Sequence, residues 1–157
     1  MKGKVAIVTG GSSGIGKALA ISFAKRGAKV VITGRSEERL NEVATALDAL
    51  NAPNLCLQLD VASEKDNRHL IEETIKSFGQ IDILVNNAGI SMRALFEETE
   101  LDVFKKVMDI NFYGTLYATK FALPHVLKTK GSIVGVSSIN GYRGTPARTA
   151  YTASKFA

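Results

Sequence analysis

Short apolar runs alternate with longer segments of helical periodicity along the whole chain, and this alternation constrains the fold more than any other feature. Five runs rich in valine and isoleucine are the predicted strands: Lys4–Thr9, Lys29–Thr33, Asn54–Leu59, Ile81–Asn86 and Gly131–Val136. The segments of helical period between them are Gly14–Arg26, Glu37–Leu50, Glu64–Phe78, Leu101–Asp109 and Phe112–Leu127. This order predicts an α/β fold, a doubly wound parallel sheet with helices on both faces.

The expected strands are almost continuously apolar, as in Val5-Ala6-Ile7-Val8. A strand with one solvated face would alternate, so these strands are expected to be covered on both faces in a central, buried sheet. Ser36 and Ser63 are expected helix N-caps, and Gly27 and Gly79 are expected C-caps. Because no repeat, low-complexity segment or linker interrupts the pattern, residues 1–157 are predicted to form a single domain.

Composition excludes several classes of protein. With 45% hydrophobic and 22% charged residues, the 157-residue chain is neither disordered, collagen-like nor a disulfide scaffold. Its net charge of +5 is scattered, so nucleic acid is not an expected partner. With no apolar run of about 18 residues and no signal peptide, we expect a cytoplasmic protein without a membrane partner. The single Cys56 is expected to be a buried structural thiol.

A glycine-rich turn, Thr9-Gly10-Gly11-Ser12-Ser13-Gly14-Ile15-Gly16, follows the first strand and opens the first helix. Free backbone N–H groups and the helix dipole make such a turn an anion site, and the expected ligand is the pyrophosphate of a dinucleotide. The alternative is that these glycines only permit tight packing. Their spacing is neither Gly-x-Gly-x-x-Gly nor that of a P-loop.

Arg35 follows the second strand, at the place where a dinucleotide fold distinguishes its cofactors. An acidic residue there binds the ribose 2′-hydroxyl of NAD, whereas an arginine pairs with the 2′-phosphate of NADP. No acidic residue ends this strand, so the sequence favours NADP(H). The alternative is that Arg35 is a solvated residue at the start of a helix.

Tyr151 and Lys155 are four residues apart, so on a helix they share one face. A nearby ammonium favours the phenolate form of a tyrosine, which helps it to exchange a proton. Ser138, after the fifth strand, would hold a substrate carbonyl oxygen near Tyr151. A Tyr-x-x-x-Lys pair that stands alone is more often a surface feature of a helix.

The motifs together resemble the classical short-chain dehydrogenase/reductase family over essentially the entire chain. Its fingerprint Thr-Gly-x-x-x-Gly-x-Gly is matched at residues 9–16. Asp60, the motif Asn86-Asn87-Ala88-Gly89, Asn111, Ser138 and the Tyr-x-x-x-Lys pair follow in the family's order.

The resemblance implies roles for particular residues. It places catalysis on Ser138, Tyr151 and Lys155, with Asn111 supporting a proton-relay water through Lys155. It implies a cofactor site made of Gly10, Ser12, Ser13, Gly14, Ile15, Gly16, Arg35, Asp60, Val61, Asn87, Ala88, Gly89, Tyr151 and Lys155. No metal is expected, because His69 and His125 have no partner at ligand spacing.

The function implied is that of an NADP-dependent oxidoreductase that interconverts a carbonyl and a secondary alcohol in a small molecule, with Tyr151 as general acid and base. The alternative is a non-catalytic dinucleotide-binding module that acts as a redox sensor or scaffold. A pure binder has no need of Ser138, Tyr151, Lys155 and Asn111, so the sequence favours the enzyme.

The sequence ends at Ala157, two residues after Lys155. Members of the resembled family continue through two more strands and a substrate-binding segment. We therefore expect the amino-terminal part of a longer enzyme, inactive by itself and a homo-oligomer at full length. The alternative is a short protein that binds the nucleotide without turnover.

Overall fold

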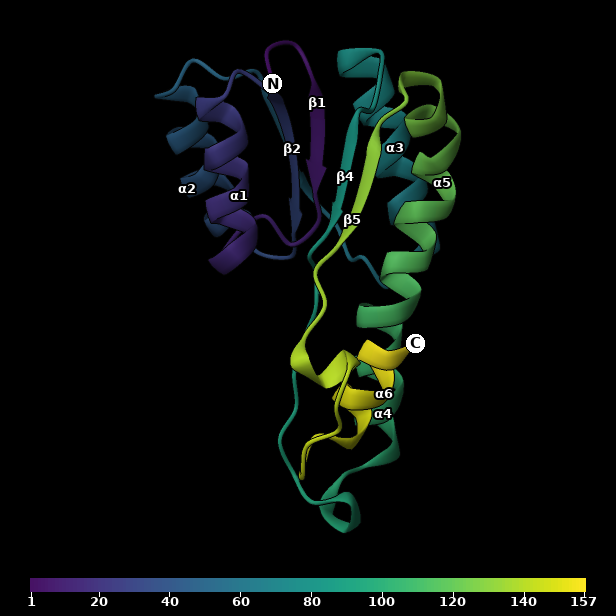
Figure 1. The fold of residues 1–157 in the computed structure, drawn as a ribbon. Coiled ribbons are helices and arrows are strands. Elements are labelled where there is room, and N and C mark those ends of the chain that lie inside the picture. Colours follow the sequence, from purple (N-terminus) through teal and green to yellow (C-terminus); the bar gives the residue numbers. More distant parts are fainter.

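Five parallel strands form the sheet at the centre of the protein (Figure 1). The computed structural model describes all residues from 1 to 157. The strands are β1 (Val5–Val8), β2 (Lys29–Gly34), β3 (Asn54–Gln58), β4 (Ile83–Asn86) and β5 (Ser132–Gly135). Their order across the sheet is β3-β2-β1-β4-β5. The chain adds β2 and β3 on one side of β1 and then β4 and β5 on the other, so the strand order reverses between β1 and β4. All five predicted strands are confirmed.

Helices cover both faces of the sheet, which confirms the doubly wound α/β fold. The helices of the protein are α1 (Gly14–Lys25), α2 (Glu37–Asp48), α3 (Glu64–Phe78), α4 (Leu101–Met108), α5 (Gly114–Thr129) and α6 (Thr149–Phe156), with short 3₁₀ turns at Phe96–Glu98 and Ile139–Gly141. One apolar cluster joins the sheet to α1 and α2, and a second joins it to α3 and α5 (Figure 1). None of these helices is both long enough and apolar enough to cross a bilayer.

The prediction that the strands are covered on both faces is wrong at the edges of the sheet. β1 is buried along its whole length, whereas β3 is half-buried and β5 is exposed throughout. Each edge strand has a neighbour on one side only. Cys56 lies on β3 and is therefore half-buried rather than buried. Burial still raises the pKa of its thiol to about 11, with a smaller contribution from the charge of Asp48.

The two helices expected over Leu101–Asp109 and Phe112–Leu127 are joined in the structure. A π-helical turn, Asp109–Tyr113, connects α4 to α5 without a break. The buried side chain of Asn111 accepts a hydrogen bond from Ile90 N–H (2.8 Å) and donates one to the Ile90 carbonyl (2.9 Å). The π-helical turn places Asn111 for this contact with a distant segment. A pattern of apolar residues does not reveal such a contact.

The expected helix caps are largely confirmed. The Ser36 and Ser63 hydroxyls accept hydrogen bonds from the backbone N–H groups of Arg39 and Asp66. Gly79 ends α3 in the left-handed conformation, with φ of 77°. Gly27 lies one residue beyond Arg26, which is the C-cap of α1.

Asp82 connects the amino-terminal ends of β1 and β4 through hydrogen bonds. Its buried carboxylate accepts hydrogen bonds from Lys4 Nζ (2.8 Å), Val5 N–H (2.9 Å) and Gln80 Nε2 (2.6 Å). Burial acts to raise the pKa of Asp82, but these hydrogen bonds outweigh it, so the pKa lies below its ordinary value of 3.8. A carboxyl group with a lowered folded-state pKa stabilises the fold above the unfolded-state value and stops doing so as the pH falls through the folded-state value.

Replacing Asp82 with Asn should lower the free energy of unfolding by about 2 kcal/mol at pH 7, because the charged acceptor of three hydrogen bonds is lost. The difference from the wild type should shrink as the pH falls below about 4, since the wild-type carboxyl is then protonated too. Urea unfolding of the protein at its natural length, at both pH values, measures this.

The matched control is Asp102→Asn, at a carboxylate that is 91% exposed and pairs only with the exposed Lys105. It should change the free energy of unfolding by less than about 0.5 kcal/mol. Equal effects at the two positions would contradict the role assigned to Asp82.

Candidate functional site

The glycine turn after β1 is fastened to the segment that follows β4. The Asn87 side-chain amide donates to the carbonyls of Thr9 (2.9 Å) and Gly10 (3.1 Å). In return, the Thr9 hydroxyl accepts from the backbone N–H groups of Asn87 (3.0 Å) and Ala88 (3.1 Å). The carboxyl ends of β1 and β4 are thereby locked together where the strand order reverses, the place at which open α/β sheets bind ligands.

Glycines are required in this turn for two different reasons. Gly10 has φ of 63°, a left-handed conformation that glycine adopts without strain. Gly16 has an ordinary φ, but a Cβ there would collide with the Gly10 carbonyl and the Asn87 amide. Because Gly16 has no side chain, α1 starts directly against the turn, and its first N–H groups are left without intrahelical partners.

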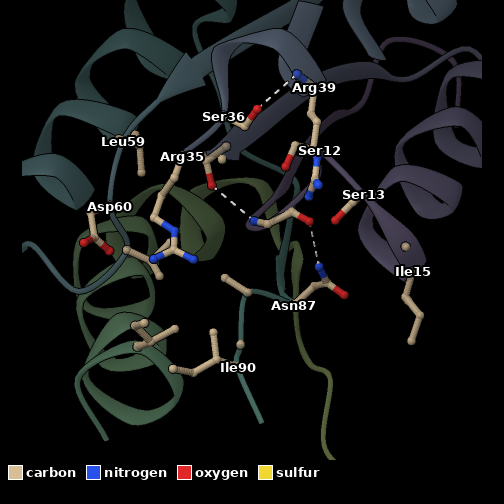
Figure 2. Close-up of a pocket in the computed structure, with 18 residues that line it drawn as sticks. Ser12, Ser13, Ile15, Arg35, Ser36, Arg39, Leu59, Asp60, Asn87 and Ile90 are labelled. Carbon is tan, nitrogen blue, oxygen red and sulfur yellow. Dashed lines mark hydrogen bonds between the residues drawn. The ribbon is translucent and has the colours of Figure 1, made fainter. Parts of the chain in front are cut away.

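A cavity of about 400 Å³ lies in front of the turn (Figure 2). The predicted cofactor residues that line it are Gly10, Ser12, Ser13, Gly14, Ile15, Arg35, Asp60, Val61, Asn87, Ala88 and Gly89. Three other predicted residues do not line it. Gly16 packs behind the turn, and Tyr151 and Lys155 lie on α6. One cavity thus collects residues that follow β1, β2, β3 and β4.

Several residues that the sequence analysis did not select complete the lining: Thr33, Gly34, Ser36, Arg39, Leu59, Ile90 and Ile110. Arg39 is the most informative of them. Figure 2 shows that its side chain reaches toward Ser12, whereas the Arg35 side chain reaches toward Asp60. Arg39 lies four residues after Arg35, in the first turns of α2, and that spacing was the available signal.

Asp60 borders the cavity with an exposed side chain. Its Oδ1 accepts a hydrogen bond from Ala62 N–H (3.0 Å), and its own N–H donates to Asp66 (2.8 Å). These contacts hold the loop between β3 and α3 in place. The other carboxylate oxygen of Asp60 makes no hydrogen bond within the protein.

Tyr151 and Lys155 lie together at the carboxyl edge of the sheet. Lys155 Nζ is 5.9 Å from the centre of the Tyr151 ring and donates a hydrogen bond to the Val136 carbonyl (2.9 Å), just after β5. A Cβ on Gly89 would lie 3.8 Å from the same ammonium. The ammonium therefore sits between Tyr151 and the segment after β4 that lines the cavity.

Asn111 and Ser138 approach this pair from two other elements. Besides Ile90, the Asn111 amide contacts the Ser154 hydroxyl (2.9 Å), which ties the π-helical turn to α6. Ser138 Oγ accepts from Asn140 N–H (3.2 Å) and makes no hydrogen bond to Tyr151. The structure thus joins Asn111, Tyr151 and Lys155 through α6 and places Ser138 at the end of the neighbouring loop.

Asn140 is a site residue that the sequence analysis missed. Its buried amide donates to the hydroxyls of Thr145 (2.7 Å) and Thr152 (3.0 Å), and so connects the loop that carries Ser138 to α6. In the sequence it is one more asparagine next to a glycine, which signals a turn rather than a buried contact.

Comparison with known proteins agrees with the geometry. The family model described as short chain dehydrogenase matches residues 4–157. Among curated proteins, the chain is 44% identical over its whole length to 11-beta-hydroxysteroid dehydrogenase-like 4A of Arabidopsis thaliana and covers 53% of that protein. It is 43% identical to 11-beta-hydroxysteroid dehydrogenase A of Arachis hypogaea, with 99% of this chain and 45% of that protein covered. The chain spans about half the length of these relatives.

Two solved structures are similar over 99% of this chain and 62% of their own, each with 29% sequence identity. One is a putative short-chain alcohol dehydrogenase from Sinorhizobium meliloti, with a TM-score of 0.94. The other is carveol dehydrogenase from Mycobacterium avium in complex with NAD, with a TM-score of 0.92.

The sheet order, the glycine turn and the cavity at the point of strand reversal define a Rossmann-like α/β protein. Together with the match over residues 4–157, they show that the chain belongs to the short-chain dehydrogenase family. The resemblance identified from the sequence motifs is confirmed.

Replacing Gly16 with Ala should lower the free energy of unfolding by about 1–3 kcal/mol, because the added methyl group pushes α1 away from the turn. Urea unfolding of the natural-length protein measures the loss. The control is Gly144→Ala, where the nearest atom to a new Cβ is 3.7 Å away. The control should change stability by less than about 0.5 kcal/mol, and a similar loss in both variants would refute the packing argument.

Proposed function

We propose that this chain carries the cofactor and proton-transfer sites of an NADP-dependent oxidoreductase that interconverts a carbonyl and a secondary alcohol. The observation that carries the proposal is the position of the Lys155 ammonium, which lies 5.9 Å from the Tyr151 ring and next to a segment that lines the cavity. A phenol and an ammonium so placed form a proton donor and acceptor beside the expected hydride carrier.

The cofactor would supply the hydride, and the chain supplies orientation and the proton. Tyr151 would donate its phenolic proton to the carbonyl oxygen in the direction of reduction and take it back in oxidation. The positive charge of Lys155, held by the Val136 carbonyl, would balance the negative charge left on Tyr151 after it has given up the proton. Ser138 would orient the carbonyl oxygen, and Asn111 would support a water that returns protons through Lys155.

The residues present fit a dinucleotide. A Cβ at Gly16 would fill the space that lets α1 start against the turn, and the free N–H groups of that helix start suit a pyrophosphate. Asp60 has a carboxylate oxygen free for the adenine amino group. The adjacent Val61 backbone and the segment Asn87-Ala88-Gly89 line the rest of the cavity.

Two arginines support NADP rather than NAD. Arg35 and Arg39 both line the cavity, and no acidic residue ends β2. A 2′-phosphate in the cavity would have a guanidinium partner available, and guanidinium pairs well with phosphate. The carveol dehydrogenase with a similar fold was solved with NAD, so the direct comparison of the two cofactors is the decisive test.

The names of the relatives suggest the first substrates to test. Several curated relatives are named for an 11-beta-hydroxysteroid, and one structural neighbour for carveol. All of these are secondary alcohols on a ring. We therefore propose a small-molecule cyclic alcohol or ketone as the substrate and, for the natural-length protein, a homo-oligomer.

The second candidate function is a non-catalytic dinucleotide-binding module that senses redox state or acts as a scaffold. The complete cavity favours it as much as it favours the enzyme, because binding needs only the residues that line that cavity. The pair Tyr151 and Lys155, which does not line the cavity, argues for catalysis.

Replacing Tyr151 with Phe should lower turnover about 100- to 10,000-fold, because the proton donor is lost. Its affinity for NADPH should stay within about threefold of the wild type, since the pocket wall is unchanged. The assay uses the natural-length protein with an 11-oxosteroid and with carvone, followed by loss of NADPH fluorescence.

The control for this variant is Tyr142→Phe, at a tyrosine that is 85% exposed. It should leave both turnover and NADPH affinity unchanged. Full turnover by Tyr151→Phe would refute the proton-transfer role of Tyr151. NADPH binding by the wild type with no turnover of either ketone would favour the binding module.

Replacing Arg35 with Asp should weaken NADPH binding about 10- to 100-fold, because a charge-assisted contact to the 2′-phosphate becomes a repulsion. NADH has no such phosphate, so its affinity should change much less. Fluorescence titration of the natural-length protein with each cofactor measures both values, with Arg143→Asp as the control at an exposed arginine outside the cavity. An equal loss for the two cofactors would show that Arg35 does not contact the 2′-phosphate.

A further inference from the structure

We propose that Arg148 is a positioning residue that latches the segment after β4 to the start of α6 and so fixes Tyr151 relative to the bound cofactor. The proposal rests on the proposed function, because it assigns Arg148 a task only if Tyr151 transfers the proton. Neither the sequence motifs nor the residues that line the cavity include Arg148.

Arg148 contacts the segment after β4 in two places. Its Nη1 donates a hydrogen bond to the Ser91 hydroxyl and a longer one to the Met92 carbonyl (3.4 Å). Ser91 and Met92 come directly after Ala88, Gly89 and Ile90, which line the cavity. The half-buried Arg148, at the N-cap of α6, is therefore tied to the segment that continues from the wall of the pocket.

Arg148 also lies over the Tyr151 ring. Its guanidinium carbon is 6.0 Å from the ring centre, and Lys155 Nζ is 5.9 Å from the same centre. Cations within about 6 Å of an aromatic ring attract it. The ring thus lies near two cationic groups, one of which is hydrogen-bonded to the segment after β4 and the other to the Val136 carbonyl.

The residue before Arg148 has a strained backbone conformation. Ala147 has φ of 60°, a left-handed conformation that costs an alanine about 1 kcal/mol. Its carbonyl accepts a hydrogen bond from Ala94 N–H (3.0 Å), so the same two segments meet through their backbones as well. A strained residue of this kind persists where its surroundings hold it, and such residues cluster at functional sites.

Arg148 therefore connects two parts of the site that are far apart along the chain. The pocket segment follows β4, whereas Tyr151 is on α6, which extends beyond the carboxyl ends of the strands and packs against α4 (Figure 1). Without Arg148, the cavity would still bind the dinucleotide, but Tyr151 would be held less firmly against it. The loss should appear in kcat rather than in cofactor affinity.

The test compares Arg148→Met and Ser91→Ala with Arg143→Met in the natural-length protein with NADPH bound. Arg143 is exposed, and its side chain makes no hydrogen bond. Hydrogen exchange measured by mass spectrometry should accelerate about tenfold in peptides covering residues 90–95 and 147–153 for the first two variants only. Ser91→Ala keeps Arg148 and provides the test if Arg148→Met fails to fold.

The kinetic readout uses the ketone assay described for Tyr151. Arg148→Met should lower kcat about tenfold with an unchanged Kd for NADPH, and Arg148→Lys, which keeps a donor and the charge, should recover part of that loss. Exchange rates equal to those of Arg143→Met, or faster exchange with an unchanged kcat, would refute the positioning role of Arg148. Full turnover by Tyr151→Phe would instead overturn the proposed function, while the exchange data would still report on the Arg148 contacts.

Discussion

The hydrogen bonds between Asn87 and the Thr9–Gly10 turn are the constraint on which the rest of the site depends. They hold the ends of β1 and β4 together at the place where the strand order reverses. Because Gly16 lets α1 start against that turn, the free N–H groups of the helix open into the cavity. The cavity therefore forms within the sheet domain itself, at the carboxyl ends of the two neighbouring strands β1 and β4.

Tyr151 and Lys155, the pair proposed to transfer the proton, are held by a different set of contacts. Lys155 is anchored to the Val136 carbonyl, Asn111 ties the π-helical turn to Ile90 and Ser154, and Asn140 ties the Ser138 loop to α6. These contacts are hydrogen bonds that join loops and the π-helical turn to one short helix, whereas the cavity rests on the largely buried strands β1, β2 and β4. A helix of eight residues gains its position from such contacts rather than from intrinsic helix propensity.

Sequence periodicity predicted the elements well where burial decides their length, and less well where a single contact does. All five strands were predicted from short apolar runs such as Val5–Val8, which helices bury on both faces, although β5 proved to be exposed. The break expected between the two helices around Asp109–Phe112 was wrong, because the Asn111 contact with Ile90 winds the chain into a π-helical turn instead. Burial of Cys56 was overestimated, because the sequence does not reveal that β3 lies at an edge.

By itself, the sequence determined the α/β class, the glycine turn with its strand and helix, and the family, because these follow from local periodicity and from motifs of fixed spacing. Only the tertiary structure decided which side chains meet. It brought Arg39 into the cavity that Arg35 also lines, Lys155 to the Val136 carbonyl, and Arg148 to Ser91 and the Tyr151 ring. The contacts of Lys155 with Val136 and of Arg148 with Ser91 join segments far apart in the chain. Such contacts depend on strand order and loop paths, which a pattern of neighbouring residues does not encode.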